Sequence, residues 1–272
     1  MLTLNSRVGS RQAVRCSKNE SPGGYPTKVP SSINIVDLKK IRKARGIFEM
    51  NYLVVVAHPD DEVLGAGATI HKLTQEGNNV AVAIMSGHAA ARANISATLK
   101  DDEANAMRIM GVKKVYHADF PNIKMNTVAH LDLVQFIEGC IEDWKAEAII
   151  THHPSDTNID HQETSHAANA ACRLFQRKEG VPRLKEFLYM EVPSSTEWTL
   201  DSSENRFLPN TFVEIGEEGI AKKIEALSVY AGVMRPYPHP RSEEALKGLA
   251  AYRGSQAGVN YAEAFETVFR SI

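Results

Sequence analysis

The chain has 272 residues and a formal net charge of −2, with 43% hydrophobic and 24% charged residues. These proportions are ordinary for a globular protein, and the length suits one α/β domain or two small ones. No apolar run approaches the roughly 18–20 residues that a bilayer-spanning helix needs. The first thirty residues also lack the apolar core of a secretory signal. A transmembrane or secreted protein is therefore not expected.

Residues 1–49 differ in composition from the rest of the chain. They are rich in Lys and Arg, so the remainder is net acidic, which argues against nucleic-acid binding by the main domain. They are also polar, contain Pro, Gly and Ser, and have no helical or strand periodicity. We therefore expect a disordered basic extension. A transit peptide or a translation start at Met50 would fit the same composition, and residues 34–46 could form a short basic helix.

From Asn51 onward, short β-branched apolar runs alternate with amphipathic helical segments. Strands are expected at 52–57, 80–85, 114–118, 147–151, 185–195 and 210–215. Helices are expected at 66–76, 99–110, 128–144, 219–230 and 242–252, and one more runs from His161 towards Arg173. This alternation predicts an α/β fold. Residues 50–272 should form one domain with a Rossmann-like, mostly parallel sheet flanked by helices.

Two clusters of metal-ligating residues follow predicted strands. The first, "AHPDDE" at 57–62, supplies His58, Asp60 and Asp61. The second lies in "HHPSDTNIDH" at 152–161, where His161 opens the helix and Asp160 is placed as its N-cap, with a contact to a metal ligand at most as an additional role. Because ligands bind beyond the carboxyl ends of parallel strands, the two clusters should meet. Imidazole with carboxylate suits zinc, and three ligands with an open fourth position are typical of a catalytic site.

The paired motifs resemble those of the LmbE/PIG-L family of zinc-dependent N-deacetylases, in its bacterial branch. "MSGHAAAR", "PSSTEW" and the stretch from "PHPRSEE" to "NYAEAF" strengthen the resemblance. The resemblance implies Zn²⁺ bound by His58, Asp61 and His161, with Asp60 as general base; Fe²⁺ or Co²⁺ would also fit. The chemistry agrees, since a carboxylate beside the metal can accept a proton from the attacking water.

One position departs from the family pattern. Many members carry a second histidine where this chain has Asn158, whose amide can contact substrate and donate to an oxyanion but cannot act as an acid. His153 or His239 could supply the acid, and His239 is preferred because "YPHPRS" is a rigid, turn-rich loop. Arg92 and Arg241 lie in loops suited to substrate contact, although either could be a solvated loop arginine.

Several neighbouring residues have more than one interpretation. Glu62 either complements the helix dipole or contacts a metal ligand. Of the adjacent His152 and His153, at most one can face the metal. "GAGATI" lacks the third glycine of a dinucleotide motif, so Gly65 and Gly67 are expected to allow close helix–strand packing. Cys16, Cys140 and Cys172 have no metal-type spacing, and reduced thiols would suit a cytoplasmic protein.

The spacing of the motifs predicts only metal-assisted amide hydrolysis. The resemblance implies the substrate class, so the leading hypothesis is a metal-dependent hydrolase that removes an N-acetyl or short N-acyl group from an amino sugar or its conjugate, such as an N-acetylglucosamine conjugate. Two alternatives remain open: an amidohydrolase acting on a non-sugar amine, and a sugar- or nucleotide-binding module without turnover. The expected partner is a small-molecule or glycoconjugate substrate. No nucleic-acid partner is expected, and a homo-oligomer is left open.

Overall fold

The computed structural model describes residues 49–86, 98–202 and 206–272. Nearly all of the extension expected at residues 1–49 lies outside this part of the chain, and so does Arg92 with the loop that holds it. Among the described residues, no helix is both long enough and apolar enough to cross a bilayer.

Within the described residues, seven strands form one sheet in the order β3-β2-β1-β4-β5-β7-β6. Strands β1 to β5 are parallel, whereas β7 pairs antiparallel with both β5 and β6. The predicted Rossmann-like, mostly parallel sheet is therefore confirmed. The strands are β1 Asn51–Val56, β2 Asn79–Ile84, β3 Lys114–His117, β4 Ala148–His152, β5 Glu186–Met190, β6 Thr211–Glu214 and β7 Ala262–Arg270.

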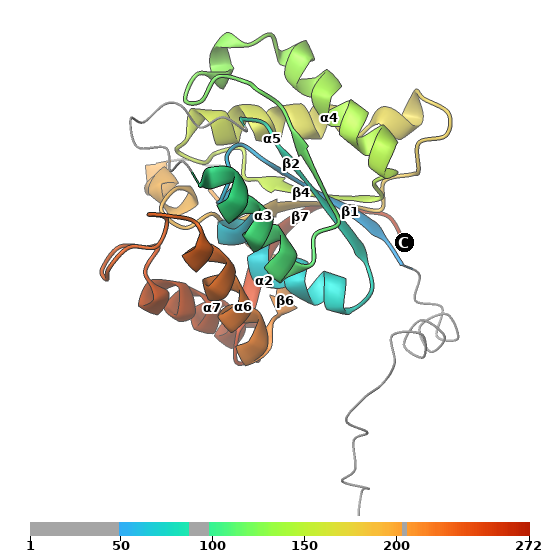
Figure 1. Ribbon diagram of the computed structural model, residues 1–272. Helices are drawn as coiled ribbons and strands as arrows, with labels where there is room; N and C mark the ends of the chain where they lie inside the picture. The colour runs from blue at the N-terminus through green and yellow to red at the C-terminus, as the bar shows by residue number, and fades with distance from the viewer. Residues whose placement is uncertain (1–48, 87–97, 203–205) are drawn as a thin grey trace, which may run out of the picture. The chain divides into compact units, whose positions relative to one another are not determined.

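Helices cover both faces of the sheet, as Figure 1 shows. Helices α4 and α5 pack on one face, while α2, α3 and α6 pack on the other. Along β1, Val54 and Val56 pack towards α2, α3 and α6, whereas Leu53 and Val55 pack towards α4 and α5. This double burial explains why the strand is apolar throughout. The helices are α2 Asp61–Gln75, α3 Leu99–Met110, α4 His130–Trp144, α5 Ile159–Ala171, α6 Gly216–Val229 and α7 Glu243–Ala257.

Several elements differ from the sequence-based expectation: β5 ends at Met190 where a strand to 195 was expected, and α7 continues to Ala257 beyond the expected end at 252. Helix α2 begins at Asp61, not at 66. Gly65 therefore lies inside the helix, where it faces Met190 of β5. A Cβ on Gly65 would lie 2.4 Å from Met190 Sδ, so the glycine permits close packing, as predicted. Strand β7 was not predicted at all; it inserts between β5 and β6 and completes the sheet.

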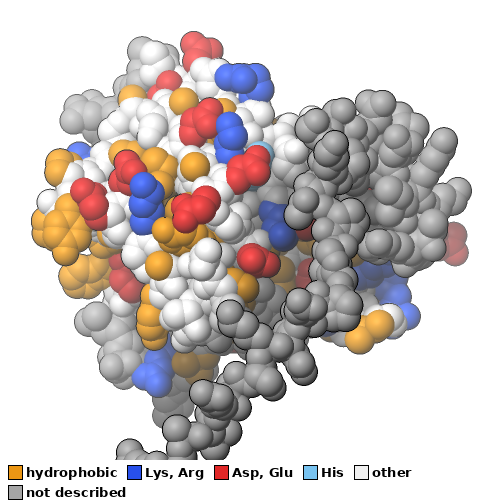
Figure 2. All heavy atoms as spheres, turned by 90° about the horizontal axis from the view of Figure 1, so that it is seen from below, with side chains coloured by type: hydrophobic (Ala, Val, Ile, Leu, Met, Phe, Trp, Pro, Cys, Tyr) orange, Lys and Arg blue, Asp and Glu red, His pale blue; other side chains and the backbone are white. Residues whose placement is uncertain are grey.

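The surface carries both signs of charge. Acidic and basic side chains are interspersed among apolar ones over the face shown in Figure 2. This distribution agrees with the nearly balanced charge of the whole sequence. Of the cysteines in the described residues, Cys140 is buried, Cys172 is half-buried, and both are free thiols.

Candidate metal centre

The two predicted motifs meet at the point where the strand order reverses. From β1 the chain proceeds to β2 and β3 on one side, then returns to β4 and β5 on the other. Such a switch point opens a crevice at the carboxyl ends of the central strands. His58 and Asp61 follow β1, and His161 follows β4, so these three residues reach the same crevice.

The side chains of these three residues converge. Asp61 Oδ2 lies 3.2 Å from His58 Nδ1 and 3.2 Å from His161 Nε2. One potential ligand atom from each residue lies within 4.8 Å of the other two. Two imidazole nitrogens and a carboxylate oxygen in this arrangement fit a zinc-like divalent ion and leave a position open on the cavity side.

Carboxylates hold the remaining nitrogen of each imidazole. His58 Nε2 lies 3.1 Å from Asp160 Oδ2, and His161 Nδ1 lies 3.2 Å from Asp156 Oδ2. Metal-bound histidines commonly contact a carboxylate in this way, which fixes the ring orientation and the tautomer. The arrangement leaves Nδ1 of His58 and Nε2 of His161 facing Asp61, where they could hold a shared ion.

The predicted N-cap role of Asp160 is wrong. Asn158 caps helix α5, because its side chain accepts a hydrogen bond from the backbone N–H of Asp160 at 2.9 Å. Asp160 is fully buried, and its carboxylate also accepts backbone N–H groups from Ile123 and Met125. The Asp160 carboxylate therefore contacts His58 and these two backbone N–H groups, and it does not accept the N–H groups at the start of α5.

The electrostatics of the cluster favour a cation. Burial opposes protonation of His58, but hydrogen bonds to Asp160 and Asp61 outweigh it and raise its pKa to about 9. Burial also opposes protonation of His161, but the nearby Asp61 charge outweighs it and raises the pKa of His161 to about 10. Burial disfavours the Asp61 carboxylate, yet His161 holds the pKa of that group well below its ordinary value. Without a metal the cluster thus attracts protons, which metal binding would displace.

His152 and His153 lie on opposite sides of their segment, as expected. The fully buried His152 accepts the backbone N–H of Ala57 through Nε2 at 2.9 Å and stacks on His161 at a centroid distance of 3.9 Å. Burial lowers the pKa of His152 to about 3, so the ring is neutral. His153 instead lies 3.4 Å from Glu266, away from the cluster. His152 therefore supports the site as a packing neighbour of His161.

Asp60 lies beside the three-residue cluster without joining it. Its backbone is left-handed, with φ of 98°, and its Oδ2 lies 3.2 Å from a guanidinium nitrogen of Arg241. Burial and the neighbouring Asp61 charge raise the pKa of Asp60 to about 7, against the opposing effect of Arg241. Such a carboxylate suits proton transfer near neutral pH.

The Glu62 side chain contacts the backbone of Asp60. Its carboxylate accepts the backbone N–H of Asp60 at 3.1 Å and the hydroxyl of Tyr230 at 2.7 Å. Burial raises the pKa of Glu62 well above its ordinary value. These contacts include none of the predicted metal ligands. They match the first interpretation, an acid in the first turn of α2 that accepts a backbone N–H at the helix N-terminus.

A cavity of about 570 Å³ opens above the cluster, within the size range of ligand pockets. Asn158 and Arg241 line it, whereas the exposed His239 does not, and its catalytic role stays a prediction. Three of the four described non-glycine residues with positive φ lie at this cavity, and such strain clusters at functional sites. The cavity is lined by His58, Pro59, Asp60, Asp61, Asn122, Ile123, Thr157, Asn158, Ile159, His161, Ser194, Ser195 and Arg241.

Sequence reasoning missed the residues that support this site from β5. Ser195 and Thr196 donate hydrogen bonds to Asp156, which the sequence grouped with the histidines without a role. The signal available was the "PSSTEW" stretch, which lies at the carboxyl end of a predicted strand and was noted only as part of the family resemblance.

The fold and the paired loops define an α/β protein with a His/Asp metal-type centre at a sheet switch point. Residues 53–172 match the family described as PIG-L: GlcNAc-PI de-N-acetylase. The chain is also 29% identical over 199 residues to the "Uncharacterized deacetylase YaiS" of Escherichia coli (strain K12), covering 70% of this chain and 92% of that protein. These findings confirm the resemblance to the LmbE/PIG-L family over this stretch.

Solved structures confirm the fold. An N,N'-diacetylchitobiose deacetylase from Pyrococcus horikoshii superposes with a TM-score of 0.65 at 18% identity, covering 88% of this chain and 94% of that chain. GalB, a 4-carboxy-2-hydroxymuconate hydratase from Pseudomonas putida KT2440, superposes with a TM-score of 0.66 at 24% identity, covering 82% and 98%. At these identities the likeness shows the fold alone, and the two described activities differ.

Proposed function

We propose that this protein is a metal-dependent N-deacetylase that removes an acetyl or other short acyl group from an amino sugar or its conjugate. The observation that carries the proposal is the placement of Asp60. It lies at the cavity beside the His58–Asp61–His161 cluster, held apart from it by a left-handed backbone and the contact with Arg241. A binding module has no use for a base in this position.

His58, Asp61 and His161 would hold the divalent ion, with zinc as the best match to the donor set. When bound, such an ion supplies a Lewis acid that polarises the amide carbonyl and acidifies the attacking water. The Asp60 carboxylate accepts the proton of that water as its oxygen attacks the carbonyl carbon. Asp60 then returns the proton to the amine nitrogen as the C–N bond breaks, which yields a carboxylate and a free amine.

Two further groups complete the proposed mechanism. The Oδ1 of Asn158 is engaged by the backbone N–H of Asp160, so its Nδ2 hydrogens are the part of the amide that can be offered to substrate. Arg241 keeps Asp60 in the cavity. The sugar class comes from the description of the family and from the chitobiose deacetylase of similar fold, because the geometry alone specifies only amide hydrolysis.

The test is acetate release from N-acetylglucosamine conjugates, with and without a chelator. We expect activity that chelation abolishes and Zn²⁺ restores. Asp60→Asn should lower kcat by about 10²-fold or more while zinc is still bound. The matched control is Asp132→Asn, which changes an exposed acid at the start of α4.

Each alternative gives a different result. Activity that survives chelation, or Asp60→Asn at the wild-type rate, would contradict the mechanism. Acid release only from non-sugar N-acyl amines would indicate another amidohydrolase. Bound zinc without hydrolysis of any N-acyl compound would favour the binding module.

A further inference from the structure

A short turn after β5 contacts both halves of the candidate site. Strand β5 pairs in parallel with β4, so its carboxyl end reaches the same edge of the sheet. The backbone N–H groups of Ser195 and Thr196 donate to the carbonyl of Val192 at 3.2 and 3.0 Å. The Glu197 carboxylate accepts the backbone N–H groups of Ser194 and Ser195 at 2.7 and 3.0 Å. The turn at residues 194–197 is thus held by its own hydrogen bonds.

One arm of this turn leads to Asp60. Arg241 Nε donates to Ser194 Oγ at 2.7 Å, and Nη1 of the same guanidinium lies 3.2 Å from Asp60 Oδ2. Both ends of this bridge have a left-handed backbone, with φ of 72° at Ser194 and 98° at Asp60. The serine hydroxyl therefore fixes the guanidinium that in turn holds the Asp60 carboxylate at the cavity.

The other arm leads to His161. Ser195 Oγ donates to Asp156 Oδ1 at 2.5 Å, and Thr196 Oγ1 donates to Asp156 Oδ2 at 2.8 Å. All three of these side chains are buried. Asp156 Oδ2 lies 3.2 Å from His161 Nδ1, which leaves Nε2 of His161 to face Asp61. Two hydroxyl groups thus set the carboxylate that orients this imidazole.

We propose that the turn at residues 194–197 is a two-armed positioning element, which orients Asp60 through Ser194 and Arg241 and orients His161 through Ser195, Thr196 and Asp156. The effect of the first arm on catalysis rests on the proposed function, because it requires Asp60 to act as the base. The second arm affects only how tightly His161 binds a metal. Because the arms end on different groups, removing their hydroxyls has separable effects. A turn that served only to stabilise the fold would not separate them.

The test uses the full-length chain and four variants: Ser194→Ala, the double variant Ser195→Ala with Thr196→Val, the conservative Thr196→Ser, and the control Ser228→Ala. Ser228 is an exposed serine on α6 whose hydroxyl bonds only within its own helix. We measure zinc affinity of the metal-free protein by calorimetry, kcat and KM on an N-acetylated amino-sugar conjugate, and the melting temperature.

The double variant should lose about 10–100-fold in zinc affinity. Thr196→Ser, which keeps the hydroxyl, should retain the wild-type affinity. Ser194→Ala should bind zinc as tightly as wild type but lose about tenfold in kcat with KM little changed, because the interaction acts on the reacting base. Ser228→Ala should change none of these quantities.

Unchanged zinc affinity in the double variant would overturn the second arm, and unchanged kcat in Ser194→Ala would overturn the first. Parallel losses of affinity and kcat in both variants, matching their melting temperatures, would reduce the turn to a structural role. If the wild-type chain hydrolyses no N-acyl compound, the proposed function fails, yet zinc affinity still tests the second arm. The crystal structure of Ser194→Ala then tests the first, since Arg241 and Asp60 should both have moved.

Discussion

The Nε2 of His58 lies 3.1 Å from Oδ2 of Asp160, which comes 102 residues later in the chain. The first turn of α5 therefore orients a predicted metal ligand that belongs to the loop after β1. The same carboxylate accepts backbone N–H groups from Ile123 and Met125, which lie between β3 and α4. One buried carboxylate thus connects the start of α5 with the segment between β3 and α4 and with the loop that carries His58.

Replacing this acid by its amide should weaken metal binding. In Asp160→Asn, one of the two acceptor oxygens becomes an NH₂ group, which cannot accept the hydrogen bonds that the carboxylate receives. We expect zinc affinity to fall about 10–100-fold, measured by calorimetry on the metal-free protein. Asp132→Asn serves as control. An Asp160→Asn variant with wild-type affinity would show that the contact with His58 has no role in binding.

Zinc should raise the melting temperature through the three-residue cluster. A ligand that binds only the folded state stabilises it by about 2.7 kcal/mol at a free concentration 100-fold above its dissociation constant. We expect this increase in the wild-type chain and its loss in Asp61→Ala, measured by thermal unfolding with and without a chelator. An equal zinc-dependent shift in both proteins would mean that the metal binds elsewhere.

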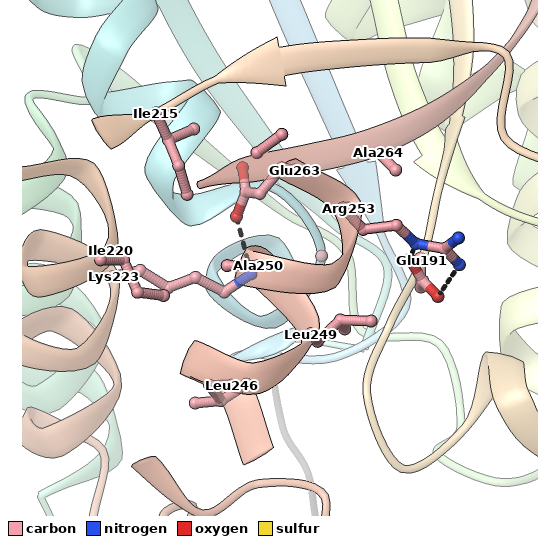
Figure 3. Close-up of a pocket in the computed structure, with 12 residues that line it drawn as sticks. Glu191, Ile215, Ile220, Lys223, Leu246, Leu249, Ala250, Arg253, Glu263 and Ala264 are labelled. Carbon is pink, nitrogen blue, oxygen red and sulfur yellow. Dashed lines mark hydrogen bonds and ion pairs between the residues drawn. The ribbon is translucent and has the colours of Figure 1, made fainter. Parts of the chain in front are cut away.

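The buried pair of Lys223 and Glu263 should contribute strongly to stability. Figure 3 shows Lys223 of α6 directed at Glu263 of β7, with Nζ and Oε1 2.7 Å apart. Glu263 also accepts the backbone N–H groups of Ala68 and Thr69 in α2. Lys223→Met leaves a buried carboxylate without its cation, and we expect a loss of about 3–5 kcal/mol in denaturant unfolding.

The neighbouring Lys222 provides a matched control for that variant. It pairs with Glu225 at 2.8 Å, but both side chains are exposed. Lys222→Met should change the free energy of unfolding by no more than about 1 kcal/mol. Equal effects of the two substitutions would show that burial of the first pair does not matter.

The glycines of α2 and α4 should respond oppositely to alanine. Gly65→Ala places a Cβ 2.4 Å from the sulfur of the fully buried Met190 and should destabilise by about 1–3 kcal/mol. No described residue outside α4 lies within 4 Å of a Cβ added to Gly139, so Gly139→Ala should stabilise by about 0.5–1 kcal/mol through helix propensity. Denaturant unfolding measures both, and a stabilised Gly65→Ala would refute the packing explanation.

Much of this protein could be predicted from local patterns. The β-branched runs that became β1 and β2 lie between amphipathic segments, which is enough to predict a parallel sheet. Gly111, in a left-handed conformation with φ of 78°, ends α3 where the sequence placed its stop. Because parallel strands present their carboxyl ends at one edge, His58, Asp61 and His161 could also be assigned to one site before any coordinates.

Other features depend on contacts between distant segments, which no local pattern records. Strand β7 lies between β5 and β6, so its formation depends on pairing with two strands from earlier in the chain. The Asp160 carboxylate does not cap α5, because His58 and two distant backbone N–H groups compete for it. The sequence by itself determined which residue types could bind a metal and which strands would carry them. Only the tertiary structure decided which carboxylate orients each imidazole, because a hydrogen bond requires two groups to meet within about 3 Å whatever their separation along the chain.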